Sequence, residues 1–283
     1  MGGYVFFDEA MENPIEQPRL VEQGQVTKDV FSPDARILEI NSKSGLYPLY
    51  MTYGIYRARL AEESAMGFEL TPEQHLALWD KTLAENLFVI CKTPMAKSIT
   101  KRTLAGFRKA KVNTRYFEDL INQIIHKPTN FIEKVKLGKT YWKANNNDNM
   151  KFNAIVGNPP YQVMDGGGTG SSAVPVYDKF VDIAKKINPE FLSMIMPSKW
   201  YSGGKGLDQF RESMLGDTRM HKLFDFDDSR DCFQGVDIAG GICYFLWDTH
   251  YNGLCNVVNY RKNEKTTSKR TLNEFDTFIR DTE

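Results

Sequence analysis

The sequence predicts an α/β protein with a mostly parallel sheet, helices on both faces of that sheet and an antiparallel edge. Short apolar runs alternate with segments of helical periodicity between residues 36 and 196, which is the pattern of parallel strands joined by helices. After Arg219 the apolar runs follow one another with little helix between them, which favours antiparallel strands. The 283 residues, 41% of them hydrophobic, are enough to bury one large core.

The expected elements alternate along most of the chain. Strands are expected at 36–40, 87–91, 111–116, 152–156 and 191–196, and then at 222–227, 241–247 and 255–260. Helices are expected at 46–60, 117–125 and 176–187, from Thr71-Pro72-Glu73 and from near Pro94. A Thr followed by Pro and Glu is a typical helix start, because the Thr side chain caps the first turn and Pro fits its first position.

Composition and charge exclude several classes of protein. Lys and Arg total 36 and Asp and Glu total 36, so a polyanion would have to be held by local patches of positive charge. Four cysteines without a C-x-x-C pair and four histidines predict neither a metal site nor a disulfide framework. Because the sequence shows no signal peptide and no apolar run of membrane-spanning length, we expect a cytoplasmic protein with no membrane contact.

One short motif carries most of the chemical information. Asn158-Pro159-Pro160-Tyr161 directly follows an apolar strand, and ligands of open α/β sheets bind outside the carboxyl ends of strands. The prolines hold Asn158 in an extended conformation. Its side-chain oxygen and a proline carbonyl then offer two acceptors, and Tyr161 offers a ring that stacks on a planar ligand. Adenine, with its exocyclic amine, meets both demands, whereas the four residues alone also suit a rigid turn.

With this motif in this place, the chain resembles the gamma-ordered N6-adenine DNA methyltransferases of the NPPY type. In particular it is similar to the methyltransferase part of type IIG restriction-modification enzymes, over nearly its whole length. The resemblance implies a Rossmann-like, class I S-adenosylmethionine-dependent methyltransferase fold. It also implies a site-specific enzyme of a restriction-modification system, which transfers a methyl group from S-adenosylmethionine to N6 of an adenine flipped out of double-stranded DNA.

The same resemblance implies the residues that act on the base. The implied catalytic residues are Asn158, Pro159, Pro160 and Tyr161, and the implied substrate-binding residues are Tyr161, Phe233 and Lys199. The adenine would be held between the rings of Tyr161 and Phe233, and no metal is needed. Because a loop Phe is more often a packing residue, the role of Phe233 depends on that of Tyr161. For the segments 177–180 and 196–200, core packing is favoured over a role in the base pocket.

Cofactor-binding residues also follow from the resemblance: Thr27, Glu39, Asn41, Gly45, Glu118, Asp119 and Asn158. Thr27 ends a motif that closes over the methionine end of the cofactor, although the same residues also suit a plain polar loop. Glu39 would receive the cofactor's ammonium group, while the turn and helix start near Gly45 favour its carboxylate. Glu118 or Asp119 would contact the adenine amine, or would equally serve as negative charge at a helix N-terminus.

Three positions depart from the family pattern. Lys43 stands where the family usually has Gly, and its side chain would crowd the cofactor. Cys91 and Lys92 stand where an acidic residue usually accepts hydrogen bonds from the ribose. Asn153 replaces a frequent Asp. These departures lower the expected affinity for the cofactor and leave the expected fold unchanged.

A run of basic residues without an intervening acid is the candidate surface for DNA phosphates. It consists of Lys92, Lys97, Lys101, Arg102, Arg108, Lys109, Lys111 and Arg115. A solvated helix face is the commoner explanation of such a run.

Three parts are expected along the chain: an N-terminal arm with the cofactor-closing motif at 1–35, a methyltransferase catalytic domain at 36–260 and a basic polar tail at 261–283. The tail is too short for a target-recognition domain. We therefore expect a fragment or a truncated relative, with recognition supplied by the missing domain or by a separate specificity subunit.

Two other functions fit the same residues. One is a catalytically degenerate methyltransferase-fold module for DNA binding or assembly, which the altered positions Lys43 and Cys91 would explain. The other is a methyltransferase of a protein glutamine amide, because an amide NH2 suits the same two acceptors. Binding of S-adenosylmethionine separates the first from an enzyme, and the position of a transferred methyl label separates the second.

Overall fold

The computed structural model describes residues 24–67, 69–145, 148–164, 173–233, 235–261 and 264–280. By their internal contacts the residues form two compact units. Unit 1 extends to Gly157 and includes Lys186–Pro189, and unit 2 comprises Asn158–Lys185 and Glu190–Glu283. Most of the expected N-terminal arm lies outside the described residues, and the expected three-part division of the chain remains a prediction.

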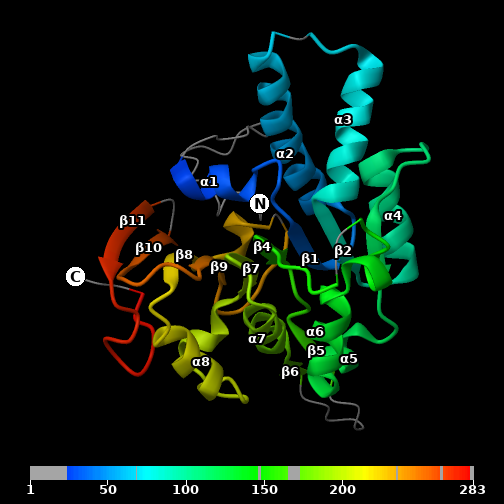
Figure 1. Ribbon diagram of the computed structural model, residues 1–283. Helices are drawn as coiled ribbons and strands as arrows, with labels where there is room; N and C mark the ends of the chain where they lie inside the picture. The colour runs from blue at the N-terminus through cyan, green and yellow to red at the C-terminus, as the bar shows by residue number, and fades with distance from the viewer. Residues whose placement is uncertain are drawn as a thin grey trace. The chain divides into compact units, whose positions relative to one another are not determined.

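Unit 1 is built on four parallel strands. They are β1 (Ile37–Ser42), β2 (Leu87–Cys91), β3 (Asn113–Tyr116) and β4 (Ala154–Gly157), in the order β4-β1-β2-β3 (Figure 1). All residues of β1, β2 and β4 are buried, which explains why these strands read as continuous apolar runs rather than as alternating ones. Each was predicted within two residues of its observed bounds.

Helices connect these strands and pack against them. They are α1 (Gly24–Val30), α2 (Leu46–Ala65), α3 (Pro72–Glu85), α4 (Pro94–Ala105), α5 (Leu120–His126) and α6 (Pro128–Lys136), followed by a π-helical turn at Gly138–Trp142. Thr71 caps α3 through a reciprocal capping box with Gln74, as the sequence predicts for this start. The sequence analysis missed α6.

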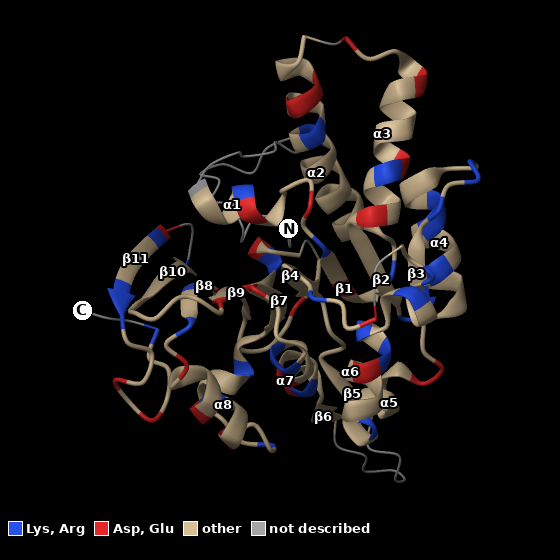
Figure 2. Ribbon diagram, viewed as in Figure 1, with Lys and Arg blue, Asp and Glu red and all other residues tan. Residues whose placement is uncertain are grey.

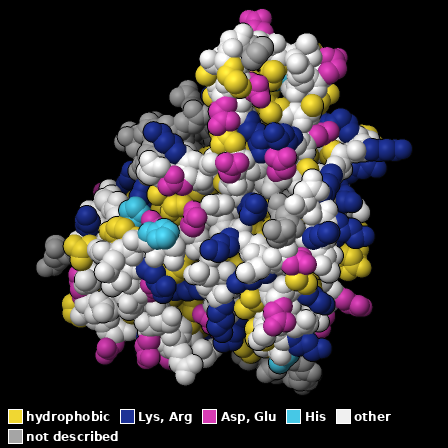
Figure 3. Space-filling view, in the orientation of Figure 1, with side chains coloured by type: hydrophobic (Ala, Val, Ile, Leu, Met, Phe, Trp, Pro, Cys, Tyr) yellow, Lys and Arg dark blue, Asp and Glu magenta, His cyan; other side chains and the backbone are white. Residues whose placement is uncertain are grey.

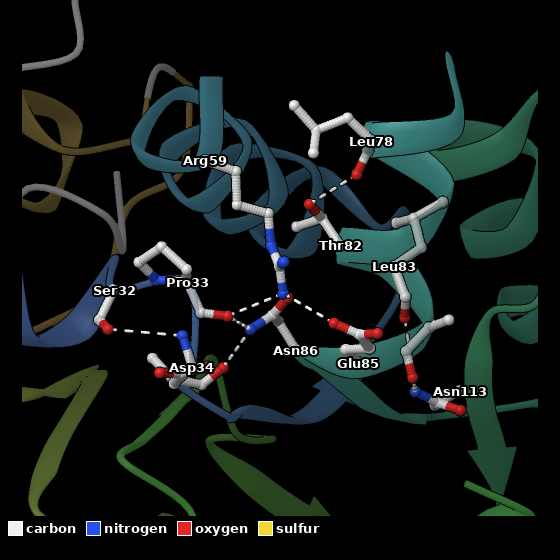
Figure 4. Close-up of polar contacts among 12 residues, drawn as sticks. Ser32, Pro33, Asp34, Arg59, Leu78, Thr82, Leu83, Glu85, Asn86 and Asn113 are labelled. Carbon is white, nitrogen blue, oxygen red and sulfur yellow. Dashed lines mark hydrogen bonds and ion pairs between the residues drawn. The ribbon is translucent and has the colours of Figure 1, made fainter. Parts of the chain in front are cut away.

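A buried polar cluster ties α2 and α3 to the start of β1 (Figure 4). Arg59 of α2 donates to the Pro33 carbonyl at 2.8 Å, to the Glu85 carboxylate at 2.8 Å and to the Asn86 side-chain oxygen at 3.0 Å. The Asn86 amide donates to the carbonyls of Pro33 and Ala35, both at 2.7 Å. The Asn86 side chain therefore hydrogen-bonds three polar groups of this cluster, which come from α2 and from the segment before β1.

We expect Asn86→Ala to lower the free energy of unfolding by about 2 to 3 kcal/mol, because the carbonyls of Pro33 and Ala35 each lose a hydrogen-bond donor and the Arg59 guanidinium loses an acceptor. Glu85→Ala is the matched control: its side chain is 51% exposed, and an exposed ion pair contributes at most about 1 kcal/mol. Urea unfolding of both variants measures the difference. Equal losses in the two variants would contradict this role of Asn86.

Unit 2 contains strands that run mostly antiparallel to their neighbours. They are β7 (Phe191–Pro197), β8 (Met220–Phe226), β9 (Ile242–Asp248), β10 (Cys255–Arg261) and β11 (Glu264–Arg270), in the order β7-β9-β8-β10-β11. The pairs β7–β9, β8–β9 and β10–β11 are antiparallel, and β8–β10 is parallel. The sequence analysis missed β11 because its residues are polar and, except for Arg270, not buried.

Unit 2 also holds short elements around a buried aromatic core. They are the hairpin strands β5 (Gln162–Met164) and β6 (Ala173–Pro175), the helices α7 (Tyr177–Ile187) and α8 (Asp208–Leu215), and 3-10 turns at Ser198–Tyr201 and Ser229–Asp231. The ring of Phe210 packs edge-on against Tyr177 and Trp200, with centroids 6.0 and 5.9 Å away. Such contacts stabilise a core beyond simple burial.

The predicted fold class is confirmed: the protein is a mixed α/β protein with a mostly parallel sheet and an antiparallel edge. Among the described residues no helix has both the length and the apolar character needed to cross a membrane. The same residues contain no group of three or more His, Cys, Asp or Glu side chains placed to hold a metal ion.

Candidate active site

The four parallel strands of unit 1 end at one common edge, and the predicted cofactor residues Glu39 and Asn41 lie in β1. Ile40 lies opposite Gly157 of β4 and Ile90 of β2, and Tyr116 at the end of β3 lies opposite Cys91. The carboxyl ends of all four strands therefore meet at the same edge, where ligands of this fold class bind. The Asn158-Pro159-Pro160-Tyr161 motif begins at the residue after β4.

The turn after β1 is held closely against α4. Gly45 has φ of 78° and precedes the first residue of α2. A Cβ atom at Gly45 would lie 2.9 Å from Thr100 Cα, so both the left-handed conformation and the close approach require glycine here. The role of this turn toward the carboxylate of a cofactor remains a prediction.

Glu39 is the most unusual residue of this edge. Its side chain is 4% exposed, and burial raises its pKa to about 8, although the Ser42 hydroxyl and the charge of Lys43 act in the opposite direction. Its Oε2 atom has no hydrogen-bond partner among the residues that the structure describes. A carboxylate oxygen that is buried and has no hydrogen-bond partner is suited to a ligand that brings hydrogen-bond donors and positive charge.

At the end of β2 the structure offers no carboxylate. Cys91 is buried, and burial raises the pKa of its thiol to about 11, so the group is neutral at physiological pH. Its Sγ atom donates to the Thr100 hydroxyl at 3.7 Å. At the position where the family usually has an acidic residue, the structure thus has the neutral, buried thiol of Cys91. Lys92 beside it is exposed.

Two other predicted cofactor positions have defined surroundings. Glu118 and Asp119 are exposed, and Asp119, with φ of 52°, precedes α5 without capping its backbone. Asp119 accepts a hydrogen bond from Asn122 instead. Thr27 is buried within α1, so the alternative of a plain polar loop at 24–27 is wrong. The roles of these residues toward a cofactor, and that of buried Asn41, remain predictions.

The Asn158-Pro159-Pro160-Tyr161 motif, whose catalytic role remains a prediction, opens unit 2. Asn158, Pro160 and Tyr161 are half-buried, and Pro159 is buried. The Tyr161 carbonyl accepts a hydrogen bond from the Val176 N–H at 3.3 Å. Because Tyr161 directly precedes β5 and Val176 directly follows β6, this bond joins the motif to the base of the hairpin.

Phe233 lies in the connection between β8 and β9, half-buried. Its N–H donates to the Ser229 carbonyl at 2.8 Å, and the Ser229 hydroxyl donates to the Val236 carbonyl and accepts from the Ile238 N–H, both at 2.8 Å. One buried serine therefore shapes the turn that carries the ring. A polar cavity of about 570 Å³ lies beside this turn, lined by residues that include Asp228, Ser229 and Arg261.

The segment 196–200 combines core residues with one exposed cation. Met196 and Trp200 are fully buried, and so are Tyr177 and Phe180 of α7, as the core-packing interpretation predicts. Lys199 is exposed in the 3-10 turn. Its role toward a substrate remains a prediction.

The basic run extends from the end of β2 through α4 to β3. In Figure 2, Lys and Arg recur along α4, and in Figure 3 blue side chains gather on the same side of the view. Two members of the run have partners within the chain: Arg108 pairs with Asp80 at 2.7 Å, and Arg115 donates to the Tyr141 carbonyl at 2.6 Å. Both phosphate binding and a solvated helix face remain open for the others.

Comparison with known families identifies the class. The family model of the Eco57I restriction-modification methylases matches residues 85–233, which is more than half of the chain. The protein is thus a restriction-modification methylase by family. It belongs to the Eco57I restriction-modification methylase family.

An "Uncharacterized adenine-specific methylase" of Mycoplasma pneumoniae is 38% identical over 130 residues, which are 44% of this chain and 31% of that protein. The chain therefore matches about a third of the length of this relative.

Solved structures share the fold at low sequence identity. The DrdV–DNA complex matches 85% of this chain and 27% of that chain with a TM-score of 0.52 at 12% identity. A modification subunit of a putative type I restriction enzyme from Vibrio vulnificus matches 82% of this chain and 45% of that chain with a TM-score of 0.50 at 10% identity. At such identities the likeness concerns the fold alone.

The buried Glu39 predicts a pH dependence of stability. Its folded pKa of about 8 lies above the ordinary value of 4.5, so between these values the folded state holds a proton that the unfolded state releases. Stability should then fall as pH rises through this window, by about 1.4 kcal/mol per pH unit for a single group. Urea unfolding at pH 5.5 and 7.5 should show this loss in the parent protein and a smaller loss in Glu39→Gln. The same loss in both proteins would contradict it.

Proposed function

We propose that this chain is the catalytic part of a site-specific adenine methyltransferase of a restriction-modification system. It transfers a methyl group from S-adenosylmethionine to N6 of an adenine in double-stranded DNA. The observation that carries the proposal is the position of Asn158-Pro159-Pro160-Tyr161 directly after β4, the strand that pairs with β1 and its buried Glu39. Membership of a restriction-modification methylase family supports it.

The methionine end of S-adenosylmethionine fits the residues after β1. The unpartnered Oε2 of Glu39 accepts from the ammonium group, whose charge would bring the raised pKa of this carboxyl back down. The turn at Gly45 and the start of α2 hold the carboxylate. Thr27 and Asn41 complete this end, and Glu118 or Asp119 accepts from the adenine amine.

The ribose end fits less closely, because Cys91 at the end of β2 is neutral and supplies no carboxylate. The ribose hydroxyls would have to find other acceptors, and weaker binding of the cofactor is the expected consequence. When bound, the cofactor supplies an electrophilic methyl group on a sulfonium.

The residues of unit 2 hold and orient the base. The Asn158 side-chain oxygen and the Pro159 carbonyl accept the two hydrogens of the adenine amine, which turns the nitrogen lone pair out of the ring plane. Pro160 fixes the backbone after these acceptors. Tyr161 and Phe233 stack on the two faces of the extruded base, and Lys199 binds the substrate nearby. Positioning and electrostatic stabilisation by these groups supply most of the rate.

The duplex is held by positive charge on unit 1, at Lys101, Arg102, Lys109 and Lys111, which are exposed. Neutralising phosphates at these positions releases counterions and makes binding dependent on salt. Target sequence is read elsewhere, by a target-recognition domain or a specificity subunit. Cytoplasmic DNA is the expected substrate.

Transfer of labelled methyl groups to duplex DNA tests the proposal. The parent chain should label adenine-containing duplex, and Asn158→Ala should reduce the rate by about a hundredfold or more, because it removes one of two groups that stabilise the reacting amine. Asn252→Ala, at an exposed position, is the matched control and should leave the rate unchanged. Label on protein rather than DNA, or equal loss in both variants, would contradict the proposal.

A further inference from the structure

Arg280, the last residue that the structure describes, contacts three segments of unit 2 at once. Its Nε atom forms ion pairs with Asp225 at 2.7 Å and with Asp227 at 3.2 Å. Its Nη2 atom donates to the Asp225 carboxylate at 3.1 Å and to the Gly240 carbonyl at 2.7 Å. The guanidinium also lies over the ring of Tyr201, 5.1 Å from the ring centre. One side chain therefore joins the end of β8, the residues before β9 and the 3-10 turn after β7.

Two of these contacts, at Asp227 and Gly240, lie at the two ends of the connection that carries Phe233, residues 227–241. A Cβ atom at Gly241 would lie 2.1 Å from a carbonyl oxygen of β8, so the two ends of this connection approach as closely as a glycine allows. The guanidinium bridges the same two ends. The position of the Phe233 connection therefore depends on a side chain from a different part of unit 2.

The 3-10 turn that carries Lys199 is held by the same cluster. The Ser198 hydroxyl donates to the Asp225 carboxylate at 3.0 Å, and the Ser198 N–H donates to the Gly241 carbonyl at 3.1 Å. A Cβ atom at Gly240 would lie 3.5 Å from Lys199 Cγ, so the Lys199 side chain runs beside the end of the Phe233 connection. The Lys199 turn and this connection therefore meet at one buried carboxylate.

Arg280 is presented by the segment 271–280, which follows β11 and is drawn in red in Figure 1. Most residues of this segment are exposed, but Leu272 and Phe278 are buried. The rings of Phe278 and Tyr201 pack with their centroids 4.5 Å apart, and the Phe278 N–H donates to the Tyr201 carbonyl at 3.1 Å. The segment is therefore anchored on the same 3-10 turn that its last residue helps to hold.

We propose that Arg280 is a positioning residue of the base-binding site, which holds the Phe233 connection against the Lys199 turn. The inference rests on the proposed function for the roles of Phe233 and Lys199, and it adds a residue from outside the region that the family model matches. Burial raises the pKa of Asp225, and the charge of Arg280 acts in the opposite direction. Without the guanidinium this carboxyl would more readily take up a proton, and the two segments would lose their common partner.

Hydrogen–deuterium exchange of the protein without DNA measures the positioning directly. In Arg280→Gln we expect the backbone amides of the Phe233 connection and the Lys199 turn to exchange about tenfold faster, because charge-assisted contacts that oppose local opening are lost. Arg219→Gln is the matched control. Arg219 also pairs with a carboxylate, that of Asp217 at 2.7 Å, and lies over a ring, that of Trp247, but these partners lie outside both segments.

Arg280→Lys separates positioning from a general contribution to stability. A Lys ammonium group pairs with Asp225 as a point charge, but it lacks the second nitrogen through which Arg280 reaches Gly240. We expect this variant to regain most of the urea midpoint that Arg280→Gln loses, while the two segments still exchange faster than in the parent protein. Recovery of both properties together, or exchange in Arg280→Gln no faster than in Arg219→Gln, overturns the proposal.

Transfer of labelled methyl groups to duplex DNA distinguishes this inference from the proposed function. If the parent protein labels adenine, Arg280→Gln should do so about tenfold more slowly, because a displaced stacking ring holds the base less well, and Arg219→Gln should keep the parent rate. The KM for S-adenosylmethionine should not change, since most predicted cofactor residues lie in unit 1. Label at the parent rate in folded Arg280→Gln overturns the role of Arg280. Absence of label in the parent contradicts the proposed function, and the exchange measurement then decides the role of Arg280 alone.

Discussion

The parallel pairing of β1 with β4 is the constraint on which the rest of this protein depends. Ile40 lies opposite Gly157, so the carboxyl ends of β1 and β4 meet at the same edge of the sheet. A slip of one residue would turn every side chain of a strand to the other face, and all residues of both strands are buried. The core therefore fixes the register, and the register fixes where the two strand ends present their polar groups.

Much of this fold could be predicted from the sequence, because the relevant signals are local. Continuous apolar runs mark β1, β2 and β4, and the Thr71-Pro72 pair marks the start of α3. What could not be predicted depends on partners distant in the sequence. β11 is polar and becomes a strand because β10 pairs with it from Arg261 back to Cys255. The segment 24–27, for which a plain polar loop was one alternative, is helical and buries Val26 and Thr27.

The candidate site also combines features that local sequence signals predict with features that depend on packing between distant residues. The Asn158-Pro159-Pro160-Tyr161 motif could be singled out in the sequence because prolines restrict the backbone wherever they occur. The state of Glu39 could not, because a pKa of about 8 arises from complete burial that sequence alone does not reveal. The close approach of Thr100 in α4 to the Gly45 turn was also hidden, since the two residues lie far apart in the sequence. The charge of the Glu39 carboxyl thus depends on how the chain packs around it as well as on the residues that the sequence supplies.

The identity of the methylated nucleoside tests the central claim most directly, since the claim concerns two acceptors that grip an amine on a purine ring. Duplex DNA incubated with the protein and S-adenosylmethionine can be digested to nucleosides and analysed by mass spectrometry. The account predicts N6-methyldeoxyadenosine, with no other methylated nucleoside above background. Methylation at cytosine alone, or DNA free of methyl groups while the protein binds S-adenosylmethionine and duplex together, would contradict it.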